Sequence, residues 1–254
     1  MILWNLIHGC HRKSEGCRHC YVFARDEENG IDTNLVRKTA SFTLPLKRDR
    51  KGQWKIPPGS MVMTCFSSDF FIEEMDTWRG EAWRMMRTRD DLCFYIVTKR
   101  PERIIASLPD YWEEIKTRVY ICCTMENQLR LEERLPIFKA APLVHREIIV
   151  EPMLEAVNFK GNLDGIDSVT VGGESGRDAR PCRYEWISWG GNGCLITSIS
   201  NYSYCLSDTG MTVIGLAFCS CHRRQLGLDA VADRRNGGLL DELFYILYAN
   251  LLTL

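Results

Sequence analysis

The sequence lacks the features that would place the chain in a membrane or mark it for export. It has no run of about 18 apolar residues, so we expect no membrane-spanning helix. Its first residues do not combine a charged start with an apolar segment, and Cys10 comes early, so we expect no export signal. The formal net charge is −1, which provides no overall attraction to nucleic acid. We therefore expect a cytoplasmic protein that does not bind membranes.

Cysteine, by contrast, is abundant, with 12 residues in a chain of 254. Several of them, such as Cys65, Cys93, Cys122 and Cys123, lie in apolar runs that are typical of buried strands. In a cytoplasmic protein we expect these to be reduced residues of the core. The hydrophobic content of 45% is sufficient for one large domain, and α/β barrels often have this length.

Three cysteines near the start form a motif of their own. Cys10, Cys17 and Cys20 are spaced C-x6-C-x2-C and follow an apolar segment, 2–7, that is predicted to be a strand. Three thiolates from one polar loop are typical of an iron–sulfur cluster. A tetrahedral zinc site would need a fourth ligand, for which the candidates are His8, His11 and His19. The alternative is that the three cysteines are simply buried near the end of a strand.

The chain then alternates between strand-like and helix-like segments. Apolar runs predict strands at 61–66, 92–97, 119–123, 147–150 and 168–171. Helices are predicted at 22–28, 73–89, 102–108 and 129–140. Strands that alternate with helices indicate βαβ units and a parallel sheet. The predicted fold class is therefore α/β, as a partial (β/α) barrel of parallel strands.

Each predicted strand becomes polar at its C-terminal end. The residues concerned are Ser67, Asp69, Lys99, Arg100, Glu126, Asn127, Glu151 and Glu174. In a barrel of parallel strands these ends lie on one face, where the active site is built. We interpret them, together with the cysteine motif, as one site. The alternative is that these side chains only reach solvent, or pair with one another in a salt-bridge network.

Further short motifs accompany the cysteines in chain order: Trp4-Asn5, Gly9-Cys10, Ser67-Ser68-Asp69, Thr98-Lys99-Arg100-Pro101, Glu126-Asn127, Glu151-Pro152, Gly172-Gly173-Glu174 and Arg180-Pro181. In these the chain resembles the phage gp-thirty-seven/gp-sixty-eight family, also described as radical-SAM-like three-cysteine proteins. The resemblance covers residues 1–187. It implies a radical-SAM-like barrel with a 4Fe–4S cluster on Cys10, Cys17 and Cys20.

The resemblance also implies a cofactor. Three cysteines leave one iron of the cluster open, and in the enzymes that the chain resembles this iron binds S-adenosylmethionine. An electron from the cluster then breaks a carbon–sulfur bond and gives a deoxyadenosyl radical. The residues expected to bind the cofactor are Ser67, Asp69, Glu126, Asn127 and Glu174, and those expected to act in catalysis are Lys99, Arg100 and Glu151. Glutamates suit a cation or ribose hydroxyls, whereas Lys99 and Arg100 suit a carboxylate or a phosphate.

Two features depart from the usual radical-SAM pattern. The usual spacing is C-x3-C-x2-C, and the first gap here is three residues longer. The Gly-Gly-Glu sequence follows a late strand, whereas the motif that contacts the cofactor amino group usually follows the second strand. Glu174 is therefore not assigned that contact by its motif alone.

The C-terminal part, 188–254, differs in composition from the rest. Glycines interrupt the expected helix after Trp186, and serine, cysteine, glycine and leucine dominate beyond it. We expect a barrel domain at 1–187 and a divergent tail at 188–254, poorly ordered or produced by a shifted reading frame. Cys219-Ser220-Cys221-His222 is a weak zinc candidate, and Leu239–Leu254 has the spacing of a docking helix.

Three functional hypotheses follow. The first is a radical enzyme acting on nucleic acid or another macromolecule, with a separately encoded protein partner. The second is a zinc or iron–sulfur module that recognises nucleic acid without catalysis. The third is an inactive remnant. The polar strand ends favour the first, because a structural metal does not need them. A basic run, Lys47–Lys51, is interpreted as a solvated turn, with contact to a phosphate backbone as the alternative.

Overall fold

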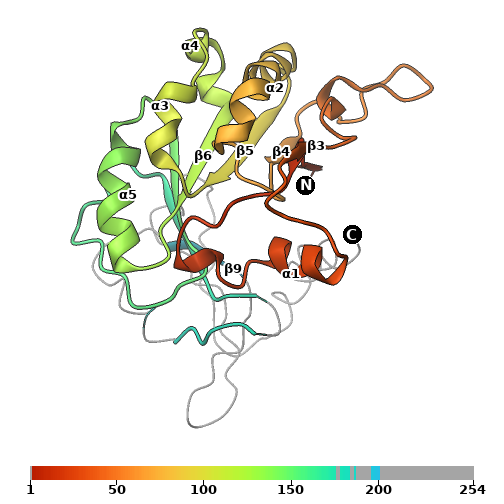
Figure 1. Cartoon of the computed structure of the whole chain (residues 1–254). Helices are drawn as coiled ribbons and strands as arrows, with labels where there is room; N and C mark the ends of the chain where they lie inside the picture. The colour runs from red at the N-terminus through yellow and green to blue at the C-terminus, as the bar shows by residue number, and fades with distance from the viewer. Residues whose placement is uncertain (1, 176–177, 184–185, 187–195, 201–254) are drawn as a thin grey trace, which may run out of the picture. The chain divides into compact units, whose positions relative to one another are not determined.

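The computed structural model describes residues 2–175, 178–183, 186 and 196–200 (Figure 1). The chain divides into two compact units, 1–219 and 220–254, and all the described residues belong to the first. The candidate zinc motif at 219–222, the docking helix at 239–254 and most of the predicted tail lie outside the described residues.

A parallel sheet of seven strands forms the centre of the first unit. In chain order and in sheet order the strands are β1 (Ile2–Trp4), β4 (Met61–Thr64), β5 (Cys93–Thr98), β6 (Val119–Thr124), β7 (His145–Val150), β8 (Ser168–Gly172) and β9 (Ile196–Ser200). Each neighbouring pair is parallel. The predicted α/β class and the six parallel strands up to Gly172 are thereby confirmed, and their C-terminal ends share one edge of the sheet.

The two outer strands of this sheet are β1 and β9, and they do not pair with each other. The described strands therefore form an open sheet, and closure into a barrel is not confirmed. The sheet also continues beyond residue 187, where we expected the first domain to end. Its seventh strand, β9, pairs with β8 from Val169 to Gly172.

The α-helices are α1 (Tyr21–Glu28), α2 (Asp76–Thr88), α3 (Ile104–Ser107), α4 (Trp112–Ile115) and α5 (Gln128–Ala140). The 3-10 turns are η1 (Glu15–Cys17), η2 (Leu44–Leu46), η3 (Glu73–Met75), η4 (Pro101–Arg103) and η5 (Lys116–Arg118). Helices α2, α3 and α5 run alongside the strands, whereas α1 lies near their C-terminal ends (Figure 1). Trp83 of α2 packs edge-on against Phe70 and Trp112, with ring centroids 4.9 and 5.7 Å apart, which joins α2 and α4 in the core. No described helix has the length and apolar character needed to cross a membrane.

The first predicted strand, 2–7, is wrong in its extent. Strand β1 ends at Trp4, and a separate strand, β2 (Ile7–His8), pairs antiparallel with β3 (Arg37–Lys38). The break falls at Asn5, whose side-chain oxygen accepts the backbone N–H of Ser67 at 3.1 Å. The chain thus leaves the main sheet before the cysteine motif, which lets the loop cross the C-terminal edge.

The long connection before β4 contains a basic hairpin at 47–55. Arg48 and Trp54 form an antiparallel bridge. Two guanidinium groups lie over the Trp54 ring, those of Arg48 at 3.6 Å and Arg89 at 4.5 Å from its centre. The hairpin tip is exposed and extends away from the helices (Figure 1).

Candidate functional site

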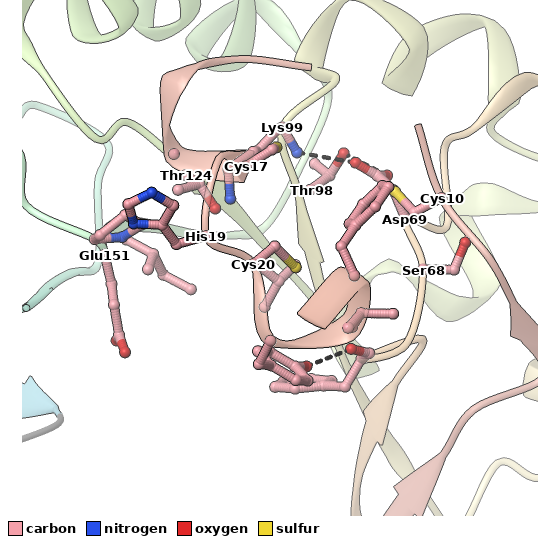
Figure 2. A pocket seen from close by; sticks show the side chains of 18 of the residues that line it. Cys10, Cys17, His19, Cys20, Ser68, Asp69, Thr98, Lys99, Thr124 and Glu151 are labelled. Atoms are coloured by element: carbon pink, nitrogen blue, oxygen red, sulfur yellow. Dashed lines mark hydrogen bonds between the residues drawn. The ribbon is translucent and has the colours of Figure 1, made fainter. Parts of the chain in front are cut away.

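A cavity of about 300 Å³ lies between the cysteine loop and the C-terminal ends of the strands. Cys10, Cys17 and Cys20 all line it, and Figure 2 shows their side chains around the same space. The three thiols are half-buried and none forms a disulfide. Five of the predicted site residues share this lining, namely Asp69, Lys99, Arg100, Glu151 and Glu174. The structure thus brings together all of the predicted metal ligands and all of the predicted catalytic residues.

Three predicted cofactor-binding residues do not line the cavity. The hydroxyl of Ser67 donates to the carbonyl of Ile7 at 2.9 Å. Asn127 is the N-cap of α5, and its side-chain oxygen accepts the backbone N–H of Arg130 at 2.8 Å. Glu126 is fully buried and faces the cysteine loop. Each of these three side chains contacts another part of the protein. Their positions do not support the expected contact with a cofactor.

Asp69 connects the strand ends to the loop through Arg100. Its buried carboxylate accepts the hydroxyl of Thr98 at 2.8 Å, the backbone N–H of Lys99 at 3.1 Å and the guanidinium of Arg100 at 2.9 Å. The other guanidinium nitrogen of Arg100 donates to the carbonyl of His11 at 2.9 Å. Burial disfavours the charge on Arg100, but the Asp69 carboxylate outweighs it and the pKa of Arg100 is raised.

Glu126 holds the middle of the loop. One carboxylate oxygen accepts the hydroxyl of Ser14 and the backbone N–H of Gly16, the latter at 3.2 Å. The other oxygen accepts a guanidinium N–H of Arg134 at 2.8 Å. Burial alone would raise the pKa of Glu126, but the positive charges of Lys99 and Arg134 and the bond from Ser14 lower it below its ordinary value.

Glu174, at the end of β8, holds the part of the loop between Cys17 and Cys20. His19 Nδ1 lies 3.1 Å from its carboxylate, which also accepts the backbone N–H and Nε of Arg180 at 2.9 and 2.8 Å. Arg180 in turn donates to the carbonyl of Glu15 at 3.0 Å. Burial opposes the charge of Glu174, but hydrogen bonds from Arg180 lower its pKa.

The polar strand ends therefore hold the cysteine loop in addition to lining a cavity. The charged side chains at the strand ends do form ion pairs, as in the expected salt-bridge network. Several of them also form hydrogen bonds to the cysteine loop. Lys99 differs from them, because its ammonium has no ion-pair partner among the described residues although it lines the cavity. This side chain is therefore available to a ligand.

Sequence reasoning missed three residues of the site. Cys65 also lines the cavity, whereas only the other three thiols were expected there. It is buried at the end of β4, with a φ of 67° that is unusual for a residue other than glycine. Its position just before the Ser-Ser-Asp sequence was the available signal. His19 was considered only as a possible zinc ligand and Arg180 only as part of a quoted motif, and neither was expected to hold the loop against Glu174.

The three thiols of the loop are candidate metal ligands. Burial, together with the Asp69 carboxylate, raises the pKa of Cys10 to about 12, so metal binding there displaces a proton. A zinc ion holds its sulfur ligands at about 2.3 Å and therefore within about 4 Å of one another. Within the part of the chain that the structure describes, no three His, Cys, Asp or Glu side chains could hold one metal ion. A 4Fe–4S cluster on these three thiols stays a prediction.

The fold and the site define an α/β protein in which a three-cysteine loop covers the C-terminal ends of a parallel sheet. The chain belongs to the family described as "Protein of unknown function (DUF5131)", whose model matches residues 2–203. This match includes β9 and leaves the resemblance to the phage family as a prediction.

Comparison with other proteins adds one distant likeness. No curated protein matches the chain. A solved structure described as "Spore photoproduct lyase complexed with dinucleoside spore photoproduct" is similar with a TM-score of 0.42 and 12% identity, over 89% of this chain and 70% of that chain. At this level of likeness, function has to be argued from the residues of the chain itself.

Proposed function

We propose that the protein is an iron–sulfur, radical-SAM-like enzyme that uses S-adenosylmethionine to modify a macromolecule. One observation carries this proposal: three free thiols of one loop line the same cavity as the charged ends of several parallel strands. A purely structural metal would need the thiols but not the cavity or the charges around it.

When bound, a 4Fe–4S cluster with three thiolate ligands keeps one iron open and supplies the electron that breaks a carbon–sulfur bond of S-adenosylmethionine. Cys10, Cys17 and Cys20 would hold this cluster. The ammonium of Lys99 suits the cofactor carboxylate, because it lines the cavity without an ion-pair partner among the described residues. Glu151 lines the cavity as well, as an acceptor suited to ribose hydroxyls or to a sulfonium charge.

The first experiment tests the metal. The full chain is purified and reconstituted without oxygen, and its iron, sulfide and zinc are measured together with the absorption and electron paramagnetic resonance spectra. We expect about four irons per chain, lost in Cys17→Ala and kept in Cys93→Ala, a half-buried cysteine outside the cavity. Cys65→Ala should also keep its iron. Zinc in place of iron, or iron retained in Cys17→Ala, would contradict the proposal, and loss of iron in Cys65→Ala would mean that no iron is open.

The second experiment tests the cofactor by calorimetry of S-adenosylmethionine binding to the reconstituted protein. A hydrogen bond to a charged group contributes about 1.5 to 3 kcal/mol, so Lys99→Gln should weaken binding about tenfold or more. Lys160→Gln is the matched control, because this exposed lysine pairs with Glu132 on the surface and does not line the cavity. Binding that is equally strong in Lys99→Gln and in the cluster-free Cys17→Ala would refute the assigned site.

For the substrate we propose nucleic acid, supported by the basic hairpin. Asp49, the acidic residue of the tip, is occupied in the turn, where it accepts the backbone N–H groups of Lys51 at 2.8 Å and Gln53 at 2.9 Å. The side chains of Arg50, Lys51 and Lys55 are exposed and have no ion-pair partner among the described residues. A projecting group of unpaired cations suits contact with phosphates.

Binding of a mixed-sequence oligonucleotide at several salt concentrations tests this substrate class. The logarithm of affinity falls with the logarithm of salt by about 0.9 per neutralised phosphate on duplex DNA. The triple variant R50A/K51A/K55A should therefore reduce the slope by up to about 3, whereas Lys160→Ala should not change it. An identical slope in the triple variant would contradict contact by the hairpin. The separately encoded protein partner stays a prediction.

The same hairpin favours a second candidate function, a metal-containing module that binds nucleic acid without catalysis. The two functions differ in one measurement. A reduced, cluster-loaded enzyme should convert S-adenosylmethionine to cleavage products in the presence of the oligonucleotide, whereas a binding module should bind the oligonucleotide and leave the cofactor intact.

A further inference from the structure

We infer that Glu126 is a positioning residue that, together with Arg134, fixes the long first gap of the cysteine motif. Six residues separate Cys10 from Cys17, but only two separate Cys17 from Cys20. A longer segment has more conformations to lose when it is ordered, so it needs more contacts to hold its thiols in one arrangement. The contacts of Glu126 are made to this segment.

The contact between Glu126 and the loop is direct and tightly fitted. Ser14 and Gly16, both within the gap, donate to the same carboxylate oxygen. An added Cβ at Gly16 would lie 3.0 Å from this carboxyl group, a tighter approach than most Cβ atoms make, so the loop backbone lies close against Glu126. Glu126 is fully buried and does not line the cavity, so it acts on the thiols through the loop and not on a ligand.

Helix α5 supports this contact with two arginines. Arg134 pairs with Glu126 at 2.8 Å, and one turn earlier Arg130 pairs with the carboxylate of Glu15 at 2.8 and 3.0 Å. Residues four apart lie on one face of a helix, so both arginines act on the same side. The η1 turn thereby bonds to α5 directly through Glu15 and indirectly through Glu126.

If the Glu126–Arg134 pair only stabilised the domain, its loss would speed amide exchange equally in every segment. If the pair positions the loop, its loss speeds exchange most in the loop. The experiment is therefore hydrogen exchange by mass spectrometry on the metal-free full chain. Glu126→Gln keeps the shape of the side chain but removes its charge. Loss of a buried pair lowers global stability, so exchange in β5 and β6 also rises. We expect the exchange of the Gly16 amide to rise about tenfold or more beyond that general increase. Glu132→Gln is the matched control, because this exposed glutamate of α5 pairs with Lys160 at 3.1 Å on the surface.

Unchanged exchange in the loop would overturn the inference, and so would an equal increase in every segment. If Glu126→Gln does not fold, Ser14→Ala decides, because it removes one donor to the same carboxylate without leaving a buried charge unpaired. Faster amide exchange confined to residues 14–17 in Ser14→Ala supports the inference. Unchanged exchange at these residues overturns it. In a double-mutant cycle, S14A should add little to the effect of E126Q, since both remove one contact.

The link to a metal rests on the proposed function and is measured separately. In reconstituted protein, Glu126→Gln should broaden or shift the electron paramagnetic resonance signal, while Glu132→Gln should not. If the wild-type chain binds no iron–sulfur cluster, the proposed function fails, but the exchange experiment still decides whether Glu126 positions the loop.

Discussion

The substitution Asp69→Asn tests how strongly the site depends on one buried charge. Asp69 and Arg100 form an ion pair in which the two side chains are only 7% and 9% exposed. Removing one partner of a buried pair costs about 3 to 5 kcal/mol, because the other charge stays buried. Asparagine keeps the oxygen that accepts the Thr98 hydroxyl, but its NH2 group would face the N–H donors of Lys99 and Arg100. We therefore expect a loss near the lower end, about 3 kcal/mol.

The assay is urea unfolding of the full chain. With a slope of about 2 to 3 kcal/mol per molar urea, this loss lowers the midpoint by about 1 to 1.5 M. Asp110→Asn is the matched control, since Asp110 is exposed, and it should change stability by less than about 0.5 kcal/mol. A loss below about 1 kcal/mol for Asp69→Asn would refute the reasoning, because Arg100 would then not depend on the charge of Asp69.

Three other predictions concern packing, capping and pH. Gly16→Ala places a methyl group 3.0 Å from the facing carboxyl group and should cost about 1 to 3 kcal/mol in urea unfolding, whereas Gly80→Ala in α2, with its nearest neighbour at 3.9 Å, should gain about 1 kcal/mol. Asn127→Ala removes the cap of α5 and should cost about 1 kcal/mol without weakening the calorimetric binding of S-adenosylmethionine. Hydrogen bonds from Arg89 lower the pKa of Asp91, so its contribution to stability is present above its unfolded pKa of about 3.9 and is lost as the pH falls through the lower folded pKa. Urea unfolding from about pH 6 to pH 3 should therefore show a smaller loss of stability in Asp91→Asn than in the wild type.

Each of these three predictions has an outcome that contradicts it. Equal effects of the two glycine substitutions would show that the close approach at Gly16 does not constrain the loop. A cap variant with strongly reduced cofactor affinity would return Asn127 to the cofactor site. An identical pH profile in wild type and Asp91→Asn would mean that the pair with Arg89 forms in the unfolded chain as well.

The sheet was predictable because buried parallel strands leave a simple pattern. The apolar run 119–123 predicted a strand that the structure places at Val119–Thr124, and the periodic segment 129–140 predicted the helix Gln128–Ala140. Both signals depend on burial along one short segment. Pairing partners depend on distant residues and leave no such pattern. Strand β3 consists of two exposed basic residues, Arg37 and Lys38, and nothing local marks them as the partner of β2.

The location of the site was predictable, but the direction of each side chain was not. Parallel strands bring their C-terminal ends to one edge, so Glu126 and Glu151 were both expected there. The structure turns Glu126 to the loop while Glu151 lines the cavity. This difference arises from the path of the cysteine loop, which covers one strand end and leaves the other beside the cavity. The metal and the cofactor stay predictions that the experiments above decide.

The bonds that hold the cysteine loop have a consequence for synthesis of the chain on the ribosome. Gly16 is bonded to a residue 110 positions later, and the carbonyl of Glu15 to one 165 positions later. At about 5 to 20 residues per second, the loop emerges roughly 10 to 30 seconds before Arg180 has been added. During this interval its thiols have none of the late contacts. The first part of the site to be translated is thus the last to be fixed, and its thiols depend on a reducing environment until the sheet is complete.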